Sequence, residues 1–292
     1  MNIFKNMALV IIASIPLSTP VLAKGGGGAT VKELAENVYS VSMFNYNSLV
    51  VIGDQDVLIT DTANSFRAKV LKEEIAKLTD KPIKKIVFSH EHFDHVGGTE
   101  VFPDAEIIAQ RNILEYEGLD PLDVVPDMIH KTFDKSMTID MGTTTVELKH
   151  YGAADGLAVA VIYLPKEKVV LTADMYVDKG LNPGVFLTDT NMLGSRALLN
   201  RIADMDLNYA INVHSQRLDL VPLLATKDFY NDLYDLVMPE IQAQLRTNPA
   251  GLIPRILEMS QTLKMPKYQD WKNYQDLPTY IQKMSFAIIH GG

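Results

Sequence analysis

Cysteine is absent from the 292-residue sequence. The protein therefore has no disulfide bonds, and it has no cysteine that could carry a lipid anchor. Its stability must come from a hydrophobic core. Hydrophobic residues make up 47% of the chain, and a chain of this length is ample for one core.

An excess of positive charge is also missing, because the formal net charge is −9 at pH 7. An acidic surface disfavours nucleic acids and anionic membranes as partners. We therefore expect a small-molecule substrate and no nucleic-acid partner. The sequence indicates nothing about the oligomeric state.

The apolar run near the start of the sequence, residues 7–16, is too short for a membrane span, which needs about 20 residues. A positively charged start precedes it, and the small-residue ending Val21-Leu22-Ala23 follows it. This is the pattern of a secretory signal peptide. We predict a signal peptide over residues 1–23, a flexible glycine-rich leader over residues 24–30, and a periplasmic or secreted protein without an integral membrane span.

Histidine is scarce, with seven residues in the chain, yet three of them fall in the segment His90-Glu91-His92-Phe93-Asp94-His95. The apolar, strand-like run 86–88 precedes this segment, and Gly97-Gly98 allows a tight turn after it. Imidazole and carboxylate groups at the end of a strand indicate a site for zinc, or for iron or manganese. Alternation along the chain predicts that Glu91 points away from the metals.

The pattern His90-x-His92-x-Asp94-His95 with the two glycines resembles the signature of the metallo-β-lactamase superfamily of metallohydrolases. The resemblance implies a four-layer αββα sandwich, with two mixed sheets face to face and helices outside. We expect residues 31–225 to form this catalytic domain. Residues 226–292 are expected to form a C-terminal helical extension packed on the same domain, with a break or kink at Pro239.

The same resemblance implies a dinuclear site for two divalent metal ions, with zinc as the first choice and iron or manganese as alternatives. The implied ligands are His90 and His92 for the first metal, Asp94, His95 and His214 for the second, and Asp174 as a bridge between the two. Asp174 and His214 each stand at the end of an apolar run, as ligands of this kind would. Asp61 ends another such run and is expected to accept a hydrogen bond from a ligand histidine.

One position departs from the superfamily pattern. Gly152-Ala153-Ala154-Asp155 stands where the superfamily has Gly-x-x-His. A carboxylate here is similar to the arrangement in alkylsulfatases of the superfamily, and we predict that Asp155 is a metal ligand that makes the centre less positive. Two alternatives stay open: Asp155 faces solvent and the first site is weak or empty, or His150 completes that site.

These features predict an exported hydrolase in which a metal-bound hydroxide attacks an ester, lactone, sulfate ester or related substrate, with Asp94 relaying a proton. β-Lactam hydrolysis is the second enzymatic alternative, and iron-dependent oxidation of the persulfide-processing type is the third. A non-catalytic metal-binding or sensor protein on the same scaffold also stays open because of Asp155. Residues 116–135, expected to form a long loop, and the C-terminal region are predicted to set specificity.

Overall fold

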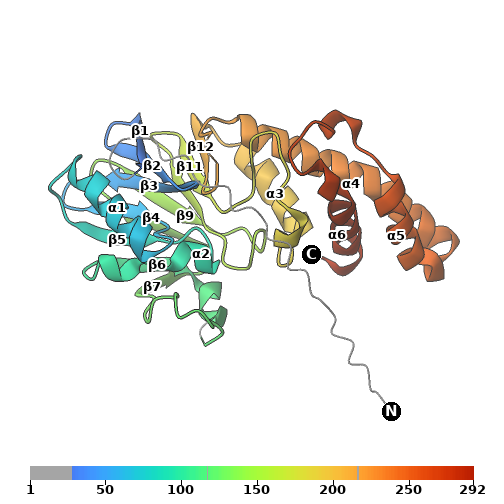
Figure 1. Ribbon diagram of the computed structural model, residues 1–292, viewed down its shortest axis with the longest axis horizontal. Coiled ribbons are helices and arrows are strands. Elements are labelled where there is room, and N and C mark those ends of the chain that lie inside the picture. Colours follow the sequence, from blue (N-terminus) through green and yellow to red (C-terminus); the bar gives the residue numbers. More distant parts are fainter. Residues whose placement is uncertain (1–27, 117, 216) are drawn as a thin grey trace, which may run out of the picture.

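The computed structural model describes residues 28–116, 118–215 and 217–292 (Figure 1). The predicted signal peptide and most of the predicted leader lie outside these residues, and Thr30 already begins the first strand. Within the described ranges, no helix combines the length and the apolar character that a bilayer-spanning helix requires.

A seven-stranded mixed sheet is built from the first part of the described chain, residues 30–133. Its strands follow one another in chain order, antiparallel from β1 to β4 and parallel from β4 to β7. The strands are β1 (Thr30–Ala35), β2 (Val38–Met43), β3 (Tyr46–Ile52), β4 (Val57–Thr60), β5 (Ile83–Val87), β6 (Glu106–Gln110) and β7 (Lys131–Phe133).

A five-stranded mixed sheet in the order β12-β11-β10-β9-β8 faces the first one. Neighbouring strands are antiparallel except β11 and β12, which are parallel. The strands are β8 (Ser136–Asp140), β9 (Thr145–Lys149), β10 (Val161–Leu164), β11 (Val169–Thr172) and β12 (Tyr209–Asn212).

Alternating side chains of the strands build the layers, because successive residues of a strand point to opposite faces. Leu58 of β4 belongs to the core between the sheets, whereas its neighbour Ile59 packs in the core that includes Leu71 of α1 (Ser65–Ala76). On the far side of the smaller sheet, Val170 shares a core with Leu198 of α3 (Met192–Ala203). The layers are thus helix, sheet, sheet and helix, which confirms the predicted αββα sandwich.

Three further helices extend the sandwich beyond α3 (Figure 1). They are α4 (Val221–Thr247), α5 (Leu252–Thr262) and α6 (Leu277–His290). Their buried side chains belong to the same core as those of α3 and the five-stranded sheet, so the predicted C-terminal helical extension is confirmed. Of the predicted break or kink at Pro239, the break is wrong, because α4 continues through this residue. Leu233 and Ile241 are buried on either side of it, and tertiary packing outweighs the local cost of proline.

The remaining helical elements are short and lie between the longer helices and the strands. The short α-helix is α2 (Phe93–Val96), and the 3-10 turns are η2 (Thr99–Val101), η3 (Arg111–Tyr116), η4 (Gly184–Phe186), η5 (Pro249–Gly251), η6 (Pro266–Tyr268) and η7 (Tyr274–Asp276). The long loop predicted over residues 116–135 is shorter than expected, since its end forms β7 beside β6.

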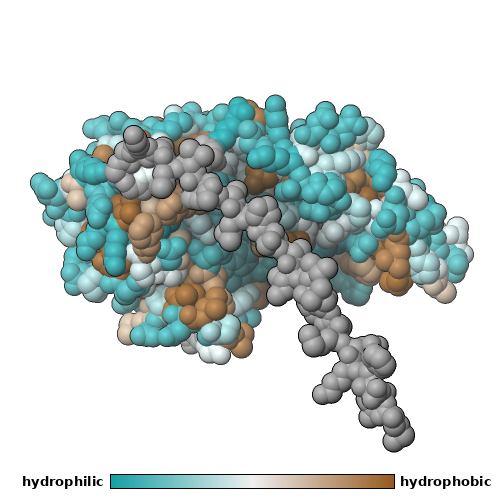
Figure 2. All heavy atoms as spheres, viewed as in Figure 1, coloured by the Kyte–Doolittle hydropathy of each residue, from teal (hydrophilic) through white to brown (hydrophobic). Residues whose placement is uncertain are grey.

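The face of the molecule in Figure 2 is largely hydrophilic, with separate apolar patches over α5 and over the loop that leads into β7. Exposed apolar side chains in these two places include Leu257 of α5 and Leu122 and Met128 of the loop. The loop therefore presents apolar surface.

Candidate metal centre

The predicted ligands meet at the ends of strands. His90 and His92 follow β5, and α2, which begins directly after them, carries Asp94 and His95. Asp174 follows β11 and His214 follows β12, and these two strands are parallel neighbours. Parallel strands end at the same edge of a sheet, so the fold brings together residues far apart in sequence.

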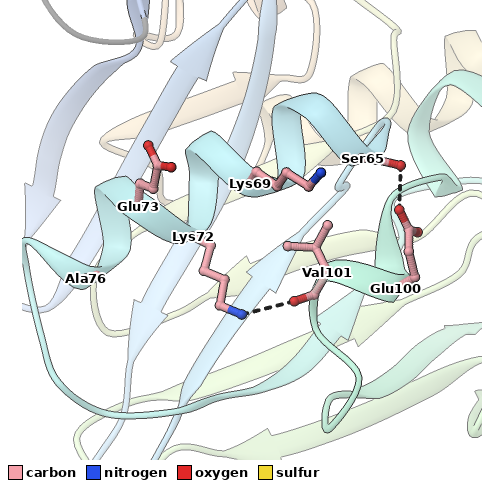
Figure 3. Close-up of a pocket in the computed structure, with 7 residues that line it drawn as sticks. All are labelled: Ser65, Lys69, Lys72, Glu73, Ala76, Glu100 and Val101. Atoms are coloured by element: carbon pink, nitrogen blue, oxygen red, sulfur yellow. Dashed lines mark hydrogen bonds between the residues drawn. The ribbon is translucent and has the colours of Figure 1, made fainter.

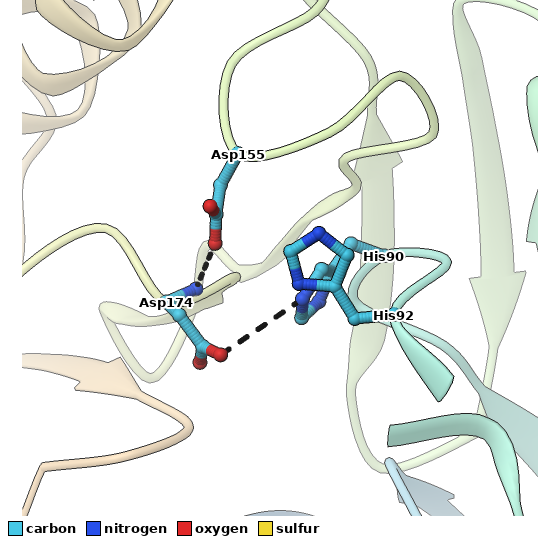
Figure 4. Close-up of side chains that lie close together, drawn as sticks. All are labelled: His90, His92, Asp155 and Asp174. Carbon is cyan, nitrogen blue, oxygen red and sulfur yellow. Dashed lines mark hydrogen bonds and ion pairs between the residues drawn. The ribbon is translucent and has the colours of Figure 1, made fainter. Parts of the chain in front are cut away.

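Two groups of side chains have the spacing that a metal ion needs, with ligand atoms within 4.8 Å of one another. The first group is His90, His92, Asp155 and Asp174, and the second is Asp94, His95 and His214. Figure 4 shows the four side chains of the first group converging.

Asp174 connects the two groups. Its Oδ2 atom lies 3.0 Å from Nε2 of His95 and 3.0 Å from Nε2 of His214, and 3.9 Å from Nε2 of His90. One carboxylate oxygen thus faces imidazoles of both groups, as the predicted bridging role requires. The assignment of all seven residues as ligands stays a prediction.

The polar atoms of the centre fit a cation. Nε2 of His90 and Oδ1 of Asp174 are buried and have no hydrogen-bond partner among the described residues. Nδ1 of His90 lies 2.9 Å from the Ser89 hydroxyl, which orients the ring. Buried polar atoms without partners are costly, and a divalent metal would satisfy both of these atoms. The mixture of imidazole and carboxylate groups suits zinc, iron and manganese.

Charge pairing perturbs the pKa values of the centre. Burial alone would raise the pKa of Asp174, but His95 and His214 outweigh it and hold this pKa well below its usual range. Burial would lower the pKa values of His92 and His214, but carboxylate partners raise each to about 9. At neutral pH, each of these two histidines therefore carries a second ring proton and a positive charge. A metal ion would have to displace that proton.

Asp155 lies inside the first group and not in solvent. It is only 6% exposed, and its Oδ2 atom accepts a hydrogen bond of 3.0 Å from the Asp174 N–H. Burial and the neighbouring charge of Asp174 raise the pKa of Asp155 to about 7. The alternative of a solvent-facing Asp155 is therefore wrong. His150 belongs to neither group, and its Nδ1 atom lies 2.8 Å from the Val159 carbonyl.

Glu91 holds the segment that carries Asp155. Its buried carboxylate accepts hydrogen bonds from the backbone N–H groups of Leu157 and Ala158, and it belongs to neither metal group. Gly156 adopts a φ of +89°, and a Cβ atom there would lie 2.4 Å from the Glu91 carboxylate. Only glycine fits this position, so the close approach depends on both residues.

Asp61 lies beside the second group, but the expected hydrogen bond to a ligand histidine is absent, because Oδ2 of Asp61 and Nδ1 of His95 have no hydrogen-bond partner among the described residues. Its Oδ2 atom lies 3.6 Å from Nδ1 of His95, and its Oδ1 atom accepts a hydrogen bond of 2.8 Å from the Ser89 N–H. The buried guanidinium of Arg67 in turn donates to the Asp61 carbonyl at 3.0 Å. These contacts fix the end of β4 against the histidine segment.

The sequence carries no signal for three contacts of the centre. The Tyr46 hydroxyl donates to Asp94 at 2.9 Å, and Nε2 of His92 lies 2.7 Å from Asp189. Nδ1 of His214 lies 3.0 Å from the backbone carbonyl of Asn45. None of these partners stands in a motif, so only the fold reveals them.

A surface hollow of about 630 Å³ lies between α1 and η2, and it contains none of the predicted ligands. Two of its polar side chains bond to other lining residues: Lys72 donates to the Val101 carbonyl at 3.1 Å, and Ser65 donates to Glu100 (Figure 3). The metal centre, with buried polar atoms that lack partners in the described part of the chain, is therefore the stronger candidate for chemistry.

Residues 42–180 match the model of the metallo-beta-lactamase superfamily. The chain thus contains a metallo-β-lactamase superfamily domain, with the fold of the superfamily's metallohydrolases and a site built from histidine and aspartate.

Two solved structures illustrate the shared fold. A metallo-beta-lactamase from Pontibacter korlensis is 18% identical and aligns with a TM-score of 0.60 over 70% of this chain and 99% of its own. A stereoselective inverting sec-alkylsulfatase from Pseudomonas sp. is 15% identical and aligns with a TM-score of 0.66 over 90% of this chain and 50% of its own. The second alignment therefore includes much of the chain beyond the catalytic sandwich.

Two curated proteins match in sequence. The 2,4-dinitroanisole O-demethylase subunit alpha of Nocardioides sp. is 24% identical over 153 residues, which are 50% of this chain and 45% of that protein. A linear primary-alkylsulfatase of Pseudomonas sp. is 33% identical over 63 residues, which are 21% of this chain and 12% of that protein. The matched part covers less than half the length of either relative.

Proposed function

We propose that the protein is a metal-dependent hydrolase similar to the alkylsulfatases, acting on a sulfate ester or a related ester. The observation that carries this proposal is the first group, in which Asp155 and Asp174 join two histidines. A second carboxylate at this place is the feature that separates the chain from the usual Gly-x-x-His pattern. The likeness to two alkylsulfatases, one in sequence and one in fold, supports the same choice.

The residues of the two groups would hold two divalent ions, and zinc is the metal we propose from the mixed donors. When bound, such ions supply Lewis acidity toward water and toward an ester oxygen. No serine or cysteine nucleophile is required for this chemistry.

Asp94 is the predicted ligand that a substrate reaches most easily, because its side chain is 54% exposed. Burial would raise its pKa, but His214, His95 and the Tyr46 hydroxyl together hold this pKa well below its usual range. Asp94 is therefore ionised at neutral pH. Tyr46 keeps its proton, because burial and the charge of Asp94 raise its pKa, and its hydroxyl donates a hydrogen bond to the Asp94 carboxylate.

We also propose that the protein acts outside the cytoplasm. The support is the charged start, the apolar run and the small-residue ending within residues 1–23.

A substrate panel tests the proposed activity. An alkyl sulfate, a p-nitrophenyl ester, a lactone and nitrocefin are each given to metal-depleted and zinc-reconstituted protein. We expect metal-dependent hydrolysis of the sulfate or the ester and slower turnover of nitrocefin. Fastest turnover of nitrocefin would favour the β-lactam alternative. No turnover of any compound by protein that holds two ions would favour a non-catalytic metal-binding protein.

A further inference from the structure

The segment 174–191 connects the metal centre to the C-terminal helices. It begins at Asp174 and ends where α3 starts. Along its length it is fixed to residues of the C-terminal region by several hydrogen bonds. They run from the Leu181 N–H to the Lys272 carbonyl (3.0 Å), from the Tyr280 hydroxyl to the Asn182 carbonyl (3.0 Å), from the Gly184 N–H to Asp276 (3.1 Å) and from Lys283 Nζ to the Thr188 carbonyl (3.0 Å).

The end of this segment is also fixed to the segment that carries Asp155. Asp155 and Thr190 form an antiparallel bridge, and the Asn191 N–H donates to the Ala154 carbonyl at 2.7 Å. Asp189 lies between Thr188, which accepts the Lys283 bond, and Thr190, which forms the bridge. Its backbone is therefore held on both sides. A side chain on a backbone fixed from two sides is placed well enough to orient another group.

The Asp189 carboxylate lies 2.7 Å from Nε2 of His92. The imidazole can donate to this carboxylate only if Nε2 carries a proton, and the neutral ring then offers Nδ1 as its electron-pair donor. His92 is a member of the first metal group, whereas Asp189 is a member of neither group. A carboxylate on the far nitrogen of a ligand histidine fixes the tautomer and makes the ring a better donor.

We propose that Asp189 is a positioning residue of the metal centre, which fixes His92 with Nε2 protonated and presents Nδ1 to the first metal. This inference rests on the metal centre of the proposed function. It gives the C-terminal region a role, because α6 and the residues before it hold the segment from which Asp189 reaches His92.

The test measures zinc affinity, which needs no substrate. Asp189→Ala, Asp189→Asn and the wild type are stripped of metal and titrated with zinc against a chromophoric chelator. Asp178→Asn is the matched control, because Asp178 lies on the same segment but is paired with Arg217 at 3.5 Å. Cobalt absorption spectra report the ligand geometry of each variant, and thermal unfolding of the metal-free forms confirms that each variant is folded.

We expect Asp189→Ala to weaken one of the two zinc-binding steps by about 10- to 100-fold, as loss of such an outer partner does. Asp189→Asn should lie between Asp189→Ala and wild type, because its amide oxygen still accepts the hydrogen bond without the charge. It also serves as the test variant if Asp189→Ala does not fold. Asp178→Asn should bind zinc as the wild type does and give the same cobalt spectrum.

Unchanged affinity and an unchanged cobalt spectrum in both Asp189 variants would overturn the role of Asp189 alone. Tighter binding in Asp189→Ala would also overturn it, because Asp189 would then compete with the metal for Nε2. A wild-type protein that binds no zinc would overturn both this inference and the proposed function.

Discussion

Replacing Asp155 by asparagine should have opposite effects on the metal-free and the metal-loaded protein. Asparagine keeps the size of the side chain, and its amide oxygen can accept the hydrogen bond from the Asp174 N–H. The substitution removes only the charge, and that charge is unfavourable without metal because Asp155 is buried beside Asp174. With metal bound, the same carboxylate is a predicted ligand, and the substitution removes its charge.

The magnitude follows from the pKa of Asp155, which burial and Asp174 raise from 3.8 to about 7. The folded state holds this proton more tightly than the unfolded state, so this group lowers the stability of the metal-free protein as the pH rises from about 4 to about 7. The loss amounts to about 4 kcal/mol at most above pH 7. Metal-free Asp155→Asn should therefore be more stable than wild type at pH 8, and the difference should vanish below pH 4.

Urea unfolding of metal-free protein between pH 4 and pH 8 measures the first effect, and plasma emission on dialysed, zinc-loaded protein measures the second. We expect bound zinc to fall from about two ions to about one, because loss of a direct ligand costs more than the 10- to 100-fold of an outer partner. Equal stability at every pH together with unchanged zinc content would refute the placement of Asp155 in the first group.

Three further predictions concern the predicted ligands and the predicted signal peptide. The double variant His90→Ala, His92→Ala should lose hydrolysis while circular dichroism shows a folded protein, and a wild-type rate would contradict the metal mechanism. Zinc affinity should rise from pH 6 to pH 9, by up to about tenfold per pH unit for each displaced proton, because the pKa values of His92 and His214 are each raised to about 9. A pH-indicator dye should therefore register proton release on zinc addition, and no release would count against this ligand set. Mass spectrometry of exported protein should find a chain that begins at Lys24, and retention of Met1 would exclude the signal peptide.

The sequence predicted much of the fold and the candidate centre because a local pattern carried the information. The segment His90–His95 places several metal-binding groups on one tight loop after a strand, and few other structures require that arrangement. Asp174 and His214 could be found because each ends an apolar strand. Parallel pairing of β11 and β12 then brings these two residues to the same edge.

The partners of the ligands could not be predicted, because no local signal marks them. Asp189 lies 97 residues from His92 in the sequence, on a segment without a motif, and only the packing of the C-terminal helices brings it to the ring. Tyr46 lies 48 residues before Asp94 and resembles any other tyrosine of a strand. Contacts of this kind are set by tertiary structure alone.

Local rules also failed where packing overrode them. Pro239 was expected to interrupt a helix, but the buried residues on both sides keep α4 continuous. The strand β7 is short and begins with an exposed lysine, so it carried too little hydrophobic pattern to be recognised. Its pairing with β6 supplies the hydrogen bonds that the sequence pattern does not reveal.

Hydrolysis should depend on metal held by the two histidine–aspartate groups. The most direct test is to strip the protein of metal, titrate zinc back and record hydrolysis of its best sulfate or ester substrate at each step. We predict no activity without metal and a rise that levels off at about two zinc ions per chain, the number that the two groups would hold. Full activity in the stripped protein would show that hydrolysis does not require the metal.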